Sequence, residues 1–371
     1  MESSANESCI NKIDSTDNDG QINSVIFGNV DKSKLNSFRV ISSGNINEMT
    51  KQPDNSILKI KMNPNINEDF IVINSNFSID YFSLNTQNAQ LACKGIFNEH
   101  KSRINDATFL RGNNSPFNEA FITGDDGGNI LIWDCRVKSS SLSLKTEDNS
   151  PVYSLDATPD FFCCGYGNEI CMYDLKTMRI VGKSSFAHSE PITSVKFYDN
   201  YLISSGEDNI ISIFNLSECM ADMKQNKNII DQERVELIMN TGQSIDKVNE
   251  VKPNVLGAIT SVNTFQLLDL NTCSSFYEFE AKNEATNYVL DSFYDKKYDE
   301  ISLLCGNFNG CLFDVRLSLG NTEKIKPVLF SCFESNLEQT FNTMGRYVCE
   351  RDAYLFCSDV GMIYLMEESK K

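Results

Sequence analysis

Short apolar runs alternate with turns rich in Gly, Asp and Asn along most of the chain. The segment 192–215 (ITSVKFYDNYLISSGEDNIISIFN) shows the order: an alternating run, a turn, a second apolar run, a tight turn and a third run. β-Branched and aromatic residues dominate such runs, and Gly, Asp and Asn supply the positive φ that tight hairpins need. The pattern predicts antiparallel sheets of short strands.

Two segments share this pattern most closely. The two histidines of the chain, His100 and His188, each stand four residues before an apolar run. Further along each segment, an aromatic residue follows a hydroxyl side chain by ten positions. The two pairs are Trp133 after Thr123 and Phe214 after Ser204. This agreement indicates two copies of one repeated unit.

Five weaker copies complete the series. Their third strands, with those of the two clear copies, end at residues 83, 134, 174, 215, 269, 314 and 366, so consecutive copies lie 40 to 54 residues apart. A repeat of ~40–45 residues built from four strands is typical of a propeller blade. We expect seven blades, although six or eight would also fit, centred on 57–84, 104–134, 152–174, 192–215, 243–270, 288–315 and 340–366.

Fourth strands are expected at 91–97, 142–147, 179–186, 235–240, 274–280 and 328–333. The last copy lacks one, because only a few polar residues follow it. The N-terminal segment 22–28 (INSVIFG) has a suitable apolar pattern and is expected to supply the missing strand. Such closure removes open sheet edges. We therefore expect one propeller over 21–367, preceded by a polar, acidic and disordered tail over 1–20.

The repeat resembles the WD40 family, over most of residues 22–367 and most specifically in the second and fourth copies. The resemblance implies an all-β, seven-bladed propeller that acts as a protein-interaction scaffold without enzymatic activity. In WD40 blades a His, a Ser or Thr, an Asp and a Trp form a buried hydrogen-bonded set. In the fourth copy, the matching residues are His188, Ser204 and Asp208, with Phe214 replacing Trp. In the second copy, they are His100, Thr123 and Trp133, with Asp126 as the nearest aspartate because Gly127 holds its usual place.

Residues that bind partners lie mostly on loops, and a propeller has loops at both of its faces. The loops that lead into each blade and the turns between second and third strands are expected to share one face, where the candidate partner contacts are Lys101, Arg103, Glu190 and Glu207. A second hypothesis concerns the endings WDCR and FDVR. They resemble the Trp-Asp-x-Arg ending of WD40 substrate receptors of cullin–RING ubiquitin ligases, which implies that Arg136 and Arg316 contact a ligase adaptor.

Charge narrows the choice of partner. The net charge is −18, from 51 acidic and 33 basic residues. Such a surface repels a phosphate backbone and favours basic proteins, so no direct nucleic-acid binding is expected. The N-terminus has no signal-peptide pattern, and no apolar run has the ~20 residues of a membrane helix. We expect an intracellular protein, nuclear or cytoplasmic, whose propeller is monomeric within a larger complex.

Catalytic signals are weak. Both histidines are assigned to the structural sets, and no His or Cys spacing suggests a metal site. The 13 cysteines are scattered, as expected of reduced, buried thiols. Neither a cofactor nor a catalytic residue is predicted, and a hydrolytic enzyme is the remote alternative.

Overall fold

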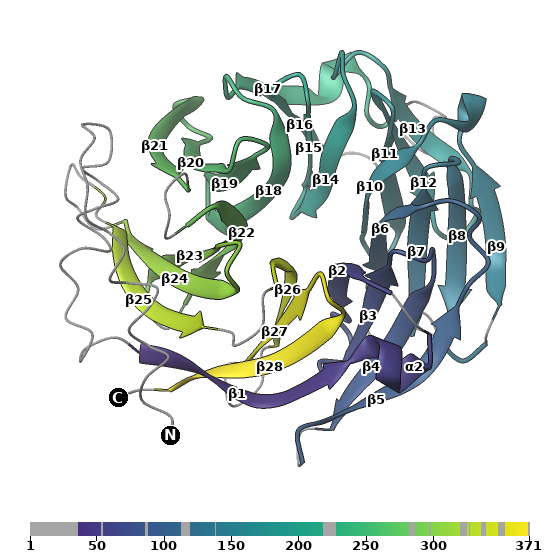
Figure 1. Cartoon of the computed structure of the whole chain (residues 1–371). Coiled ribbons are helices and arrows are strands. Elements are labelled where there is room, and N and C mark those ends of the chain that lie inside the picture. Colours follow the sequence, from purple (N-terminus) through teal and green to yellow (C-terminus); the bar gives the residue numbers. More distant parts are fainter. Residues whose placement is uncertain are drawn as a thin grey trace, which may run out of the picture.

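The computed structural model describes residues 36–52, 55–85, 88–112, 119–137, 139–217, 228–281, 286–296, 298–319, 325, 327–334, 339–347 and 353–369. In this part of the chain, groups of four antiparallel strands surround a common axis (Figure 1). The seven-bladed WD40-type propeller expected from the repeat is confirmed. The tail over 1–20 and the proposed strand over 22–28 lie outside the described residues.

The first four blades follow the chain in order. Blade one contains β2 (Ile57–Met62), β3 (Asp69–Asn74), β4 (Ile79–Asn85) and β5 (Gln90–Phe97). Blade two contains β6 (Ile104–Phe109), β7 (Ala120–Asp125), β8 (Asn129–Asp134) and β9 (Ser140–Lys145). Blade three contains β10 (Val152–Ala157), β11 (Phe161–Tyr166), β12 (Glu169–Asp174) and β13 (Ile180–Ser184). Blade four contains β14 (Ile192–Tyr198), β15 (Tyr201–Gly206), β16 (Ile210–Asn215) and β17 (Val235–Asn240).

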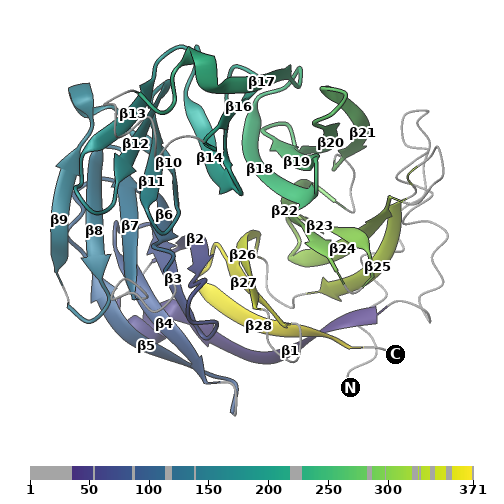
Figure 2. The same ribbon diagram turned by 180° about the vertical axis from the view of Figure 1, so that it is seen from behind.

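The remaining blades complete the ring, as the view from behind also shows (Figure 2). Blade five contains β18 (Ile245–Lys252), β19 (Val255–Thr260), β20 (Thr264–Asp269) and β21 (Ser274–Glu280). Blade six contains β22 (Tyr288–Asp295), β23 (Glu300–Gly306), β24 (Cys311–Ser318) and β25 (Pro327–Glu334). Blade seven contains β26 (Phe341–Tyr347), β27 (Ala353–Ser358), β28 (Met362–Ser369) and β1 (Asn36–Asn45). The short helix α2 (Ile46–Thr50) follows β1.

The fourth strand of blade seven comes from further along the chain than the segment 22–28. β1 pairs antiparallel with β28, for example Val40 with Met366 and Asn45 with Met362. At its start β1 also pairs in parallel with β25, so blades six and seven share one eight-stranded sheet. Figure 1 shows β1 along the outer side of β28. The edge of the last blade is therefore covered, which prevents pairing with another chain.

Burial within a blade follows strand position. The second strands β3, β7 and β11 are buried at every residue, because sheets pack on both of their faces. The outer strand β9 instead alternates between half-buried and exposed residues. Apolar side chains of the described residues gather in seven clusters, and each cluster lies between two neighbouring blades. A fully buried Leu, Ile or Phe contributes about 1.5–3 kcal/mol, so these clusters hold the blades in register.

Candidate functional site

The loop that enters blade two is tied to that blade by a buried chain of hydrogen bonds. His100 Nε2 lies 2.7 Å from Thr123 Oγ1, and His100 Nδ1 lies 2.7 Å from Asp125 Oδ2. The indole N–H of Trp133 donates to Thr123 Oγ1 at 2.8 Å. All four side chains are buried. With a proton on Nδ1, His100 donates to Asp125, and its Nε2 accepts from the Thr123 hydroxyl.

The aspartate of this set is Asp125, and the prediction of Asp126 was wrong. Asp125 ends β7 and also accepts from the backbone N–H groups of Gly127 (2.9 Å) and Asn129 (2.8 Å), so it holds the following turn. The exposed Asp126 accepts from Asn105 Nδ2 at 2.6 Å instead. Burial alone would raise the pKa of Asp125, but hydrogen bonds from His100 and Asn129 outweigh it and lower the pKa to about 2.

Blade four carries a shorter version of the set. His188 Nε2 lies 2.8 Å from Ser204 Oγ, and His188 Nδ1 lies 3.1 Å from Asp208 Oδ1. Phe214 is fully buried in the place of Trp133 and has no N–H to donate. Burial lowers the pKa of His188 even though Asp208 opposes the shift. The neutral imidazole of His188 therefore acts as a structural link, and both histidines are buried.

These links shape one face of the ring. We call it the turn face and define it by the turns between second and third strands, at 75–78, 126–128, 167–168, 207–209, 261–263, 307–310 and 359–361. The loops that enter each blade lie on the same face: Asp126 N donates to Arg103 O, and Glu207 N donates to Pro191 O. The four predicted contacts are all exposed in these loops and turns: Lys101, Arg103, Glu190 and Glu207.

The turn face has an apolar half that the sequence patterns did not indicate. Four adjacent blades, numbers five, six, seven and one, each expose an apolar side chain at the turn. These tips are Val262 (45% exposed), Phe308 (65%), Val360 (44%) and Phe77 (37%). The turns of blades two, three and four expose Asp126, Asn168 and Glu207 instead. The sequence signal for these tips is an apolar residue within a turn that otherwise consists of polar residues and Gly.

The two arginines of the ligase hypothesis lie in different environments. β8 ends at Asp134, so Arg136 falls in the following turn, where its exposed side chain pairs with Asp134 (2.6 Å). β24 continues to Ser318, so Arg316 lies within the strand and is only 2% exposed. The expectation that Arg316 contacts a partner was therefore wrong.

Arg316 instead pairs with two buried carboxylates. Its guanidinium lies 2.7 Å from Asp314 and 2.6 Å from Asp295, and 4.5 Å from the centre of the Phe330 ring. A strand that continues past the Asp-x-Arg sequence buries the arginine, whereas a turn exposes it. The ligase hypothesis retains Arg136 alone.

Other chemistry is limited in the described part of the chain. No three His, Cys, Asp or Glu side chains there come close enough together to hold a metal ion. Cys163 and Cys164 are buried thiols whose pKa values burial raises well above the ordinary value, which disfavours the nucleophilic thiolate. No helix among these residues is long and apolar enough to cross a bilayer.

Comparison with known proteins agrees with the fold. The family described as WD domain, G-beta repeat, matches residues 91–134 and 182–215, the segments that contain the two histidine sets. The chain thus contains matches to the WD40 repeat, and its described residues fold as a seven-bladed β-propeller. It is 24% identical over 267 residues to the WD repeat-containing protein 89 homolog of Dictyostelium discoideum, which covers 65% of this chain and 70% of that protein. It is also 25% identical over 162 residues to restriction of telomere capping protein 1 of Candida tropicalis, or 38% of this chain but only 14% of that protein.

Proposed function

We propose that this protein is a non-enzymatic scaffold that binds a protein partner across the turn face. The observation that carries the proposal is the row of apolar tips on four adjacent blades. An isolated exposed apolar residue needs no explanation, but one on each of four neighbouring turns, set on a rigid ring, suits a protein interface. Phe308 is the most exposed tip, at 65%, and is proposed as the main anchor.

The backbone at Phe77 supports the same proposal. Each of the seven turns contains one residue with positive φ: Phe77 (67°), Gly128 (75°), Gly167 (49°), Asn209 (66°), Asn263 (61°), Gly310 (81°) and Gly361 (78°). Six are Gly or Asn, which accept this conformation at little cost. Phe77 has a side chain in this strained conformation and is still 37% exposed. Strain of this kind is concentrated at functional positions.

The polar half of the turn face is proposed to select the partner by charge. Glu190, Glu207 and Asp126 are exposed there, together with Lys101 and Arg103. With a net charge of −18, the chain would attract a partner whose apolar contact surface is flanked by basic groups. Exposed charges are screened over about 8 Å at physiological salt, so association should slow as salt rises.

Affinity capture of three tagged forms from matched cells tests the proposal. The wild type is compared with Phe308→Ser/Val262→Ser and with Ile238→Ser, a control on the outer strand β17 where the side chain is 57% exposed. We expect the double variant to lose partners, by quantitative mass spectrometry, that the control retains. Equal recovery by all three forms would refute a turn-face interface.

A further inference from the structure

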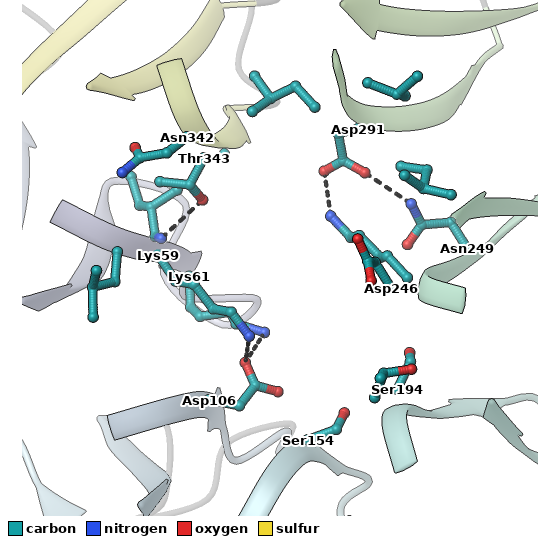
Figure 3. A pocket seen from close by; sticks show the side chains of 18 of the residues that line it. Lys59, Lys61, Asp106, Ser154, Ser194, Asp246, Asn249, Asp291, Asn342 and Thr343 are labelled. Carbon is teal, nitrogen blue, oxygen red and sulfur yellow. Dashed lines mark hydrogen bonds and ion pairs between the residues drawn. The ribbon is translucent and has the colours of Figure 1, made fainter. Parts of the chain in front are cut away.

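The ring encloses a cavity of about 570 Å³ along its axis. The first strand of every blade lines it, through residues of β2, β6, β10, β14, β18, β22 and β26. Its volume lies within the ~300–1,000 Å³ range of small-molecule sites. Figure 3 shows Lys59, Lys61 and Asp106 on one side of this space and Asn249 and Asp291 on the other.

The lining is basic although the chain is strongly acidic. Four lysines line the cavity, Lys59, Lys61, Lys196 and Lys247, against three aspartates, Asp106, Asp246 and Asp291. The cavity therefore carries a formal charge of +1 inside a protein of −18. A local positive charge in an acidic protein favours the binding of an anion.

The ion pairs leave positive charge in excess on one side. Lys59 and Lys61 share the single carboxylate of Asp106, at 3.4 and 2.7 Å. Lys247 has its own partner, Asp291, at 2.6 Å. The side-chain ammonium group of Lys196 lines the same cavity and makes no hydrogen bond or ion pair with any described residue. The three remaining ammonium groups thus share two cavity carboxylates, Asp106 and Asp246, which leaves an excess of one positive charge.

Electrostatics agree with this count. Burial lowers the pKa of Lys196, and Lys61 and Lys247 lower it further, while Asp156 and Asp106 oppose the shift. Burial also lowers the pKa of Lys59, which Lys61 and Lys247 reinforce against Asp106. The Asp156 carboxylate is already paired with Arg111. The lysines thus lie within electrostatic reach of one another in a desolvated space, where an incoming anion would favour their charged forms.

Hydroxyl groups stand beside the lysines. Ser154 Oγ lines the cavity and accepts a hydrogen bond from Val195 N at 2.9 Å, so its own hydrogen remains available. Ser194, on β14, also lines the cavity, and its side-chain Oγ makes no hydrogen bond to a described residue. Figure 3 shows the two serines on the same side of the open space. Ammonium and hydroxyl donors together suit a phosphate group.

We propose that the central cavity binds the phosphate group of a small anion, with Lys196, Lys59 and Lys61 as charge partners and Ser194 as a hydrogen-bond donor. A phosphate monoester carries about −1.5 to −2 at neutral pH, which is enough to offset the positive charge of the lining. The ligand is free phosphate or a small phosphate ester. This site is separate from the turn-face tips and does not depend on them.

Calorimetric titration of the full chain at constant ionic strength tests the site. The probes are inorganic phosphate, glycerol 3-phosphate and sulfate, and the variants are Lys196→Met and Ser194→Ala. Lys145→Met, an exposed lysine on β9, is the control for net charge. We expect saturable 1:1 binding of a phosphate probe, weakened at least tenfold by Lys196→Met and unchanged by Lys145→Met. Whether the ester or free phosphate binds more tightly identifies the source.

Thermal unfolding gives a second test, in which Lys196→Met should stabilise the ligand-free protein although it weakens phosphate binding. Without ligand, Lys196→Met should unfold at a higher temperature than the wild type, because it removes a desolvated and unpaired ammonium group. It should also lose the rise in melting temperature that phosphate produces in the wild type. The proposal fails if no phosphate probe binds saturably, if sulfate binds as tightly, or if Lys196→Met binds like the wild type.

Discussion

His100 Nδ1 lies 2.7 Å from Asp125 Oδ2, and this contact joins the loop entering blade two to the turn after β7. The same aspartate accepts backbone N–H groups of that turn, so one side chain orders two segments of the turn face. The buried hydrogen-bonded set thus supports the turn face from beneath. The contribution of this set to the free energy of unfolding can be compared with that of the shorter set in blade four.

Thr123→Val should destabilise the protein more than Ser204→Ala. The first change leaves both the Trp133 N–H and the His100 Nε2 without a partner. The second affects only the His188 Nε2, because Phe214 has no N–H to satisfy. A buried polar group left without a partner costs about 1–3 kcal/mol. Urea unfolding of the two variants measures the difference, and equal losses would mean that the indole contact contributes nothing.

Arg316→Met should cost about 3–5 kcal/mol, because it removes the cation that pairs with the buried carboxylates of Asp314 and Asp295. Arg136→Met is the matched control: its pair with Asp134 is exposed, and such pairs contribute about 0–1 kcal/mol. Chemical denaturation of both variants separates the two environments. A small loss for Arg316→Met would show that the surrounding structure relaxes to hydrate the carboxylates.

Asp80→Asn should stabilise the protein at pH 7 by roughly 1–3 kcal/mol. Burial raises the pKa of Asp80 from 3.8 to about 6, against a hydrogen bond from Asn74. Between those values the folded chain binds a proton that the unfolded chain does not, so the cost of the charge is largest above pH 6 and fades toward pH 4. The measurement is stability against pH, where the variant should lack this dependence. The control variant, Asp126→Asn at an exposed position, should show the same dependence of stability on pH as the wild type.

Phe77→Asn should raise stability by about 1–2 kcal/mol, because Asn adopts the left-handed conformation at less cost. Asn209→Ala, at the corresponding turn of blade four, should have the opposite effect. Thermal unfolding tests both changes. If the apolar tips bind a partner, Phe77→Asn should also weaken partner capture while the fold becomes more stable; a loss of stability would show that Phe77 is not strained.

Much of the fold could be predicted from local patterns. The fourth strand expected over 235–240 is β17 (Val235–Asn240), and the one expected over 274–280 is β21 (Ser274–Glu280). The closing strand could not be placed as well, because several N-terminal segments have a similar apolar pattern. The pairing partner β28 selects Asn36–Asn45 by its register, and register is a relation between distant strands.

The order of apolar runs, turns and histidines by itself determined a closed ring of four-stranded blades, because each blade repeats the same local constraints. Tertiary structure decided the environments. Asp125 rather than Asp126 faces His100, since the end of β7 sets which side chain turns inward. Arg316 is buried and Arg136 exposed although both follow the same short motif. The four lysines of the central cavity come from three strands, and this cavity exists only once the ring is closed.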